Sequence, residues 1–211
     1  MTIRIGDTAP DFDVDTTNGP IRLHEWMGDS WVFFFSHPAD YTPVCTTEMG
    51  RTSQLIEEFN KRNTKPLGLS TDTVEEHKAW INDVNETQNT NLTFPIVADP
   101  DLRIAKLYDM IHPSESETAA VRSVFIIDPN KKVRLILTYP MSVGRNFDEI
   151  LRVIDALQIG DQLTVATPAD WRPGAKVIIP PSISDEQAEV MFPQGWDSIK
   201  PYLRLTETKQ G

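Results

Sequence analysis

Short runs of apolar residues along this chain indicate the strands of a buried sheet. Residues 31–36 are almost entirely apolar, and a run of this length predicts a strand buried on both faces. Residues 67–70 and 94–98 predict two more strands. Residues 123–127 and 133–138 flank a turn that contains proline, which predicts a β-hairpin.

Apolar residues at helical spacing separate these strands. Leu55, Ile56 and Phe59 form the apolar face of one such segment, and Thr73 with Glu76 makes a capping box at the start of another. The predicted helices cover residues 43–63, 73–85 and 102–111, and a fourth, longer helix begins at residue 146. This order predicts an α/β domain with a central mixed sheet covered by helices on both faces, compatible with a thioredoxin-like fold.

The pattern changes after residue 165, where proline becomes frequent. Short elements remain, and Trp171 and Trp196 provide apolar surface that must be buried. Short elements are predicted over residues 176–179 and 202–205, with a helix over 185–192. We therefore expect a main domain over residues 1–165 and a C-terminal arm or small subdomain over 166–211, packed on the main domain or on a second subunit.

Composition and charge narrow the range of partners. The 211 residues are 39% hydrophobic and 24% charged, which is ordinary for a globular protein. The net charge of -11 argues against nucleic acid and anionic membrane surfaces as main partners. The first residues lack the apolar core of a signal peptide, so we expect a cytoplasmic protein, although import into an organelle stays open.

The chain contains one cysteine, Cys45, which excludes an internal disulfide and a cysteine-rich metal site. An inert buried thiol is the simplest interpretation of a lone cysteine. The neighbouring residues favour a reactive one, because Thr42 is a good N-cap and Pro43 suits the first helical position. Cys45 then lies in the first turn of a helix, where the helix dipole and the N–H groups stabilise a thiolate.

Several residues can complete a site around this thiol. The Thr42 hydroxyl lies three residues before Cys45, and Pro38 can rigidify the loop and shield it from water. A guanidinium is the best fixed cation for a thiolate and a bound oxygen, and Arg122 and Arg145 are the candidates. Glu48, one turn after Cys45, can hold an arginine by a bidentate contact. Arg145 can instead pair with acidic residues that follow it.

The spacing of Pro38, Thr42 and Cys45, with an arginine downstream at the edge of a strand, resembles the peroxiredoxin active site. The longer string over residues 36–48, SHPADYTPVCTTE, resembles the one-cysteine, peroxiredoxin 6-type subfamily. So do GRNFDE at residues 144–149, ATPADW at 166–171 and the proline-rich C-terminal arm. The resemblance covers essentially the whole chain.

This resemblance implies a thiol peroxidase that reduces hydrogen peroxide and organic hydroperoxides in antioxidant defence. Cys45 would be the nucleophile and become a sulfenic acid, Thr42 and Arg122 would orient the peroxide, and Pro38 would shield the oxidised sulfur. Glu48 and Arg145 would support the site, and His37 would lie near the thiol. No metal, flavin or nicotinamide is implied. Because a second cysteine is absent, an external thiol or another reductant must complete the cycle. The resemblance also implies a homodimer.

Two other functions remain open at the level of sequence. The protein can be a redox sensor or holdase that oxidation of Cys45 switches. The string GDSW at residues 28–31, with His24, resembles the phospholipase A2 motif of the peroxiredoxin 6 group. Val32 and Asn130 depart from that motif, and an amide cannot stabilise an imidazolium as a carboxylate does. His77 and His112 have no metal-ligand spacing around them, so we interpret them as solvated or structural.

Overall fold

The structure is a computed structural model that describes residues 2–208, and the chain divides into two compact units. The first unit ends at Phe147 and the second begins at Asp148. The helix that begins at residue 147 therefore belongs with the C-terminal elements in space. The division between a peroxidase domain and an arm at residue 165 stays a prediction.

A seven-stranded mixed sheet forms the centre of the first unit within the described residues, with strand order β2-β1-β5-β4-β3-β6-β7. The central strand β3 pairs in parallel with β4 and antiparallel with β6. The hairpin predicted from the sequence is formed by β6 and β7. The strands are β1 Asp13–Thr16, β2 Gly19–Arg22, β3 Trp31–Ser36, β4 Thr64–Ser70, β5 Ile96–Ala98, β6 Arg122–Ile127 and β7 Val133–Tyr139.

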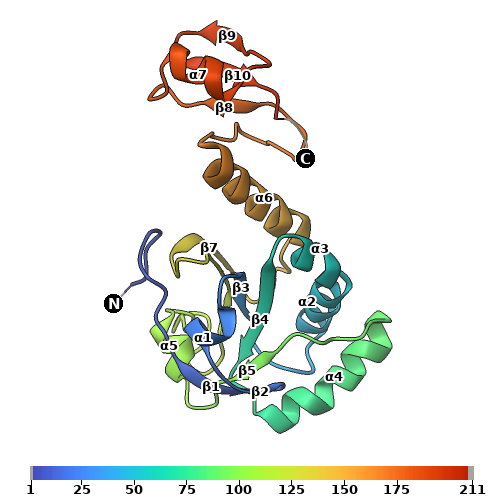
Figure 1. Cartoon of the computed structure of the whole chain (residues 1–211). Helices are drawn as coiled ribbons and strands as arrows, with labels where there is room; N and C mark the ends of the chain where they lie inside the picture. The colour runs from blue at the N-terminus through green and yellow to red at the C-terminus, as the bar shows by residue number, and fades with distance from the viewer. Residues whose placement is uncertain (1, 209–211) are drawn as a thin grey trace. The chain divides into compact units, whose positions relative to one another are not determined.

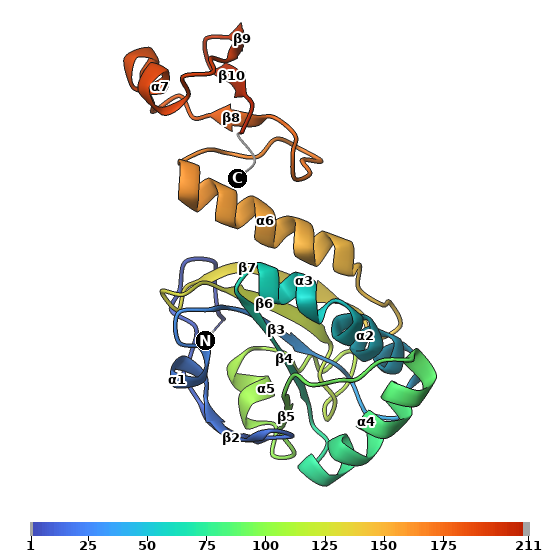
Figure 2. The same cartoon turned by 45° about the vertical axis from the view of Figure 1, so that its right-hand side comes forward.

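Helices cover both faces of this sheet, as the sequence predicted (Figures 1 and 2). The helices α1 and α5 lie on one face, and α2, α3 and α4 lie on the other. These helices are α1 Leu23–Met27, α2 Pro43–Gln54, α3 Ile56–Lys61, α4 Val74–Gln88 and α5 Arg103–Leu107. On β3, Phe34 packs against Tyr108 on one side, while Phe33 stacks on Phe59 of α3 on the other. Burial on both faces explains why β3 is apolar throughout.

Two helical predictions were wrong in their bounds. The helix expected over residues 43–63 is two helices, because the chain turns at Leu55, whose N–H bonds back to the carbonyls of both Arg51 and Thr52. The helix expected over residues 102–111 begins at Arg103, because Leu102 before it has a left-handed conformation with φ 61°, and it ends at Leu107. The short helix α1 was not predicted. The capping box of Thr73 and Glu76 is present at the start of α4.

The second unit has its own small sheet and its own core. The strands β8, β10 and β9 pair antiparallel in that order. The elements are α6 Phe147–Leu163, β8 Val177–Ile179, α7 Asp185–Met191, β9 Asp197–Lys200 and β10 Leu203–Thr206. Trp171 is buried among apolar side chains of this unit, so the predicted small subdomain is a folded body. The strand β9 was missed because all four of its residues are exposed and carry no apolar pattern.

No helix among residues 2–208 has both the length and the apolar character that crossing a bilayer requires.

Candidate active site

Cys45 is the third residue of α2, which begins at Pro43 as the sequence predicted. Thr42 has the extended backbone of an N-cap residue, with φ -111° and ψ 147°, but its side chain does not cap the helix. Its hydroxyl donates instead to the carbonyl of Ala39, 2.8 Å away. The Thr42 hydroxyl therefore does not bond to the N–H groups at the start of α2. Its hydrogen bond to Ala39 instead stabilises the loop before Cys45.

The Cys45 thiol is buried and lies beside a guanidinium. Nη1 of Arg122 is 3.3 Å from Sγ of Cys45, within hydrogen-bonding distance of sulfur. Arg122 is the first residue of β6, and its Nε and Nη2 both donate to the carbonyl of Met141, at 2.9 and 2.7 Å. These bonds fix the plane of the guanidinium, so that Nη1 is directed at the sulfur.

Glu48 lies one turn after Cys45 and joins two arginines. Its Oε2 accepts from Nη1 of Arg122 at 2.8 Å and from Nη2 of Arg145 at 2.6 Å. Its Oε1 accepts from both the backbone N–H and Nε of Arg145. Nη1 of Arg145 donates to the carbonyls of Ser36 and Ser123, on the neighbouring strands β3 and β6. The bidentate contact expected of Glu48 is thus made with Arg145, and Arg122 shares the same carboxylate.

The charges of this cluster favour an anionic sulfur. Arg122, Arg145 and Glu48 are all less than a tenth exposed. Burial alone would raise the pKa of Glu48, but the charges of Arg145 and Arg122 and the hydrogen bonds from Arg145 outweigh it, so the pKa is lowered. Two guanidinium groups and one carboxylate leave one positive charge, which a Cys45 thiolate balances. An uncompensated buried charge is costly, so the surroundings stabilise the thiolate form.

The loop between β3 and α2 contains His37 and Pro38, both of which are buried. Nε2 of His37 lies 2.8 Å from Oδ1 of Asp40. Burial lowers the pKa of His37, and the hydrogen bond to Asp40 opposes this only in part. Among the described residues, no hydrogen bond joins His37 to Cys45, and Nδ1 of His37 has no partner. The structure places His37 in the same loop as the site but not in contact with the thiol.

Cys45 and the residues before it differ in exposure. Cys45 itself has no exposed surface, whereas Thr42 and Val44 are partly exposed. The thiol is therefore closed off from solvent in this structure. Contact between the Thr42 hydroxyl and a substrate stays a prediction.

Ser30 and His24 are not brought together. The Ser30 hydroxyl donates to Oδ1 of Asn63, and Nε2 of His24 lies 2.8 Å from the carbonyl of Ala9. In the part of the chain that the structure describes, no hydrogen bond joins Ser30 to His24. The predicted phospholipase side activity gains no support from this geometry.

Sequence reasoning missed several groups around the site. Met141 acts through its backbone carbonyl, which no side-chain pattern can reveal. His77, interpreted as solvated or structural, is fully buried, so the solvated alternative is wrong. It contacts Asp40, a residue that the sequence analysis did not select.

Comparison with known proteins agrees with this site and fold. Residues 5–136 match the model of the AhpC/TSA family, and residues 156–195 match the C-terminal domain of 1-Cys peroxiredoxin. The 1-Cys peroxiredoxin of Dictyostelium discoideum is 51% identical over 204 residues, which cover 97% of this chain and 85% of that protein. The mitochondrial peroxiredoxin PRX1 of Saccharomyces cerevisiae is 50% identical, with 98% and 82% covered.

Solved structures confirm the thioredoxin-like α/β fold with a C-terminal extension. The yeast mitochondrial 1-Cys peroxiredoxin has a TM-score of 0.93 and 50% identity, and 98% of this chain and 100% of that chain are covered. That structure addresses the thiol resolving mechanism of the yeast protein via glutathione/thioredoxin systems. A cysteine-to-serine mutant of peroxiredoxin 6 from Arenicola marina has a TM-score of 0.92 and 44% identity, with 99% and 100% covered.

Proposed function

This chain belongs to the 1-Cys peroxiredoxins, and from that membership we propose how its residues reduce a peroxide. The protein is a thiol-dependent peroxidase with one cysteine. The observation that carries the proposed division of roles is the 3.3 Å contact between Nη1 of Arg122 and Sγ of Cys45. This contact places a fixed cation directly beside the sulfur of Cys45, the one cysteine of the chain.

The oxidative step proceeds by displacement at the peroxide O–O bond. The Cys45 thiolate attacks one peroxide oxygen, so that an S–O bond forms while the O–O bond breaks. The leaving hydroxide or alkoxide takes up a proton, and Cys45 becomes a sulfenic acid. Arg122 stabilises the charge that develops on both oxygens, and the Thr42 hydroxyl orients the peroxide. Hydrogen peroxide and organic hydroperoxides both fit this scheme, because each presents the same O–O bond.

The remaining residues support the two that contact the substrate. Glu48 and Arg145 hold Arg122 against the sulfur through the contacts described above. Pro38 shields the oxidised sulfur from water, and His37 is the candidate partner for that sulfur after the first turn of α2 moves. Its unpartnered Nδ1 is available to accept a hydrogen bond.

Replacing Arg122 by alanine is expected to slow the second-order reaction with peroxide by roughly 10²–10³-fold, the scale of removing one charge-stabilising donor. Glu48 keeps Arg145 as its partner, so the variant should still fold. Arg122→Lys restores the charge but not the planar fork, and should recover only part of the rate. Stopped-flow kinetics with hydrogen peroxide measures this, with the exposed Arg22→Ala as a control. An unchanged rate in Arg122→Ala would refute its role.

The reductive half of the cycle requires a reductant outside this chain. An external thiolate attacks the sulfenic sulfur, so that an S–S bond forms while the S–O bond breaks, and the leaving hydroxide takes up a proton from solvent to become water. A second thiol then reduces the mixed disulfide. A yeast relative studied with glutathione/thioredoxin systems supports low-molecular-weight or protein thiols as the class of reductant. After one equivalent of peroxide, intact-mass spectrometry should show the gain of one oxygen atom, then a thiol adduct when glutathione is added. A Cys45–Cys45 linked dimer as the main turnover species contradicts this cycle.

Assembly and location are also proposals. We propose a homodimer in which the second unit takes part, which sedimentation or light scattering of the purified protein can measure.

We propose the cytoplasm as the compartment, because the catalytic thiol must be kept reduced and the cytosol does so. A tagged full chain found in an organelle by microscopy would overturn this, and the yeast mitochondrial relative makes that comparison informative.

A further inference from the structure

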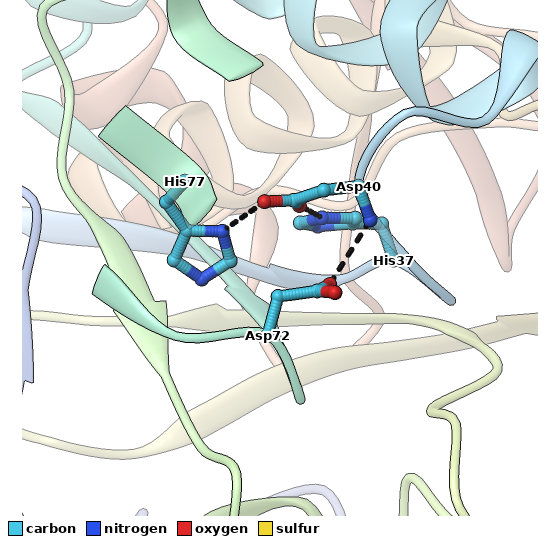
Figure 3. A group of neighbouring side chains, drawn as sticks. All are labelled: His37, Asp40, Asp72 and His77. Atoms are coloured by element: carbon cyan, nitrogen blue, oxygen red, sulfur yellow. Dashed lines mark hydrogen bonds and ion pairs between the residues drawn. The ribbon is translucent and has the colours of Figure 1, made fainter. Parts of the chain in front are cut away.

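A compact group of two histidines and two aspartates lies beside the active-site loop, outside the cluster around Cys45 (Figure 3). His37 and Asp40 come from the loop after β3, Asp72 follows β4, and His77 lies in α4. Each offers one ligand atom, and these atoms all lie within 4.8 Å of one another. We name these four residues the His–Asp quartet.

His77 has oxygen acceptors at both ring nitrogens. Its Nε2 lies 3.1 Å from the carbonyl of Val97, and its Nδ1 lies 2.6 Å from Oδ2 of Asp40. If the N–H at Nε2 donates to Val97, a neutral ring directs the lone pair of Nδ1 at a carboxylate oxygen. Nδ1 of His77 and Oδ2 of Asp40 are then two ligand atoms that face one another, placed to hold a cation between them. A histidine whose other N–H is held by a backbone carbonyl is the usual arrangement of a metal-binding imidazole.

The quartet also carries an excess of negative charge. Its two carboxylates, of Asp40 and Asp72, contribute two negative charges. Within residues 2–208, neither Asp40 nor Asp72 forms an ion pair with a lysine or arginine. Asp40, His37 and His77 are all buried, where an uncompensated charge is costly. A divalent cation would cancel this charge in full.

We propose that the His–Asp quartet binds one divalent transition-metal ion, with zinc as the best match. Two imidazole nitrogens and two carboxylate oxygens are a ligand set that zinc accepts in tetrahedral geometry. At bonds of about 2.0–2.1 Å the ligand atoms lie roughly 3.3 Å apart. The Asp40 contacts of 2.6 and 2.8 Å must therefore lengthen by about 0.5–0.7 Å, while the wider separations, which reach up to 4.8 Å, must shorten. Any proton held by these ligand atoms leaves to solvent as the ion binds.

The surroundings suit such an ion. Nδ1 of His37 has no partner among the described residues, so the ring proton can move there without breaking a bond when Nε2 becomes a ligand. Asp72 is held by the Ser70 hydroxyl at 2.6 Å and by the backbone N–H of Asp40 at 3.0 Å. Asp72 is also partly exposed, which gives the ion a path from solvent.

The test is metal binding by the full chain after chelator treatment. The protein is titrated with Zn²⁺, and separately with Co²⁺ as a spectroscopic probe, in excess Mg²⁺ to occupy exposed carboxylates. We expect one bound ion per chain by elemental analysis and the intense visible bands of tetrahedral cobalt. Cys45→Ser should bind equally well, which separates this site from the catalytic thiol.

Variants locate the ion. Asp72→Asn keeps an oxygen that accepts from Ser70 but loses the charge, and should weaken binding at least about 10-fold. His77→Gln should abolish the visible bands of bound cobalt. The exposed Glu75→Gln, in the same helix, is the control and should leave metal binding unchanged. His37 and His77 are both buried, so the partly exposed Asp72→Asn is the variant that should disturb folding least, and His37→Asn provides a second ligand variant. If no ion is retained, or if binding is unchanged in Asp72→Asn and His37→Asn, the proposal is overturned and the ion is adventitious.

Discussion

Cys45→Ser is expected to abolish peroxide reduction while the protein remains folded. Serine differs from cysteine by one atom, and Nη1 of Arg122 can donate to the hydroxyl as it does to Sγ. A buried serine hydroxyl stays protonated and is a weak nucleophile, so the displacement at the O–O bond cannot begin. Turnover should fall at least about 10³-fold, the scale of removing a covalent nucleophile. Peroxide consumption with excess external thiol over many turnovers measures this loss.

The control for this variant is Thr47→Ser, an exposed change in the same helix. It should leave both the rate and the melting temperature unaltered. Multiple turnovers that persist in Cys45→Ser would show that another group reduces peroxide. A single stoichiometric oxidation in the unmodified protein, without turnover under excess thiol, would instead favour a redox sensor.

The start of the site was predictable because it is local in sequence. The backbone of Thr42, Pro43 at the first helical position and Cys45 in the first turn follow from residue preferences that act over a few positions. Both Arg122 and Arg145 were candidates from their chemistry, and the resemblance gave Arg122 the catalytic role and Arg145 a supporting one. The structure separates them, because Arg122 contacts the sulfur and Arg145 holds Glu48.

The His–Asp quartet was beyond the reach of spacing rules because three segments contribute to it. His37 follows β3 and Asp72 follows β4, and these strands are parallel neighbours, so their carboxyl ends meet at one edge. His77 then enters from α4. Nothing in the sequence around any one residue indicates the others. The short β9 was missed for a different reason, since its four residues are all exposed and carry no apolar pattern.

Glu48→Ala is expected to be the most destabilising single change in the site. Glu48 is buried, and its carboxylate is shared by the guanidinium groups of Arg122 and Arg145. Its removal leaves two buried cations with only the Cys45 thiolate to balance them, and the loss of one partner of a buried pair typically costs about 3–5 kcal/mol. The melting temperature should fall by roughly 10 °C. Scanning calorimetry of the two proteins at neutral pH measures the difference.

Glu48→Gln separates charge from shape in this effect. Glutamine keeps the size of the side chain and one oxygen acceptor, so any loss of stability that it shares with Glu48→Ala comes from the charge. Peroxide reactivity should also fall, because Arg122 is no longer held by a carboxylate. The exposed Glu75→Gln is the matched control and should alter neither property. Equal stability of Glu48→Gln and the parent at neutral pH would contradict the electrostatic origin.

The pH dependence provides an independent test of the same ion pairs. The folded pKa of Glu48 is lowered from 4.5, so the unfolded chain takes up this proton first as the pH falls. The stability that Glu48 contributes is therefore fully present above pH 4.5 and is lost progressively as the pH falls through the folded pKa. Glu48→Gln has no such proton to bind. The difference in the free energy of unfolding between the parent and Glu48→Gln should be constant near neutral pH and shrink below pH 4.5. A difference that stays constant in acid would show that these buried charges do not stabilise the fold.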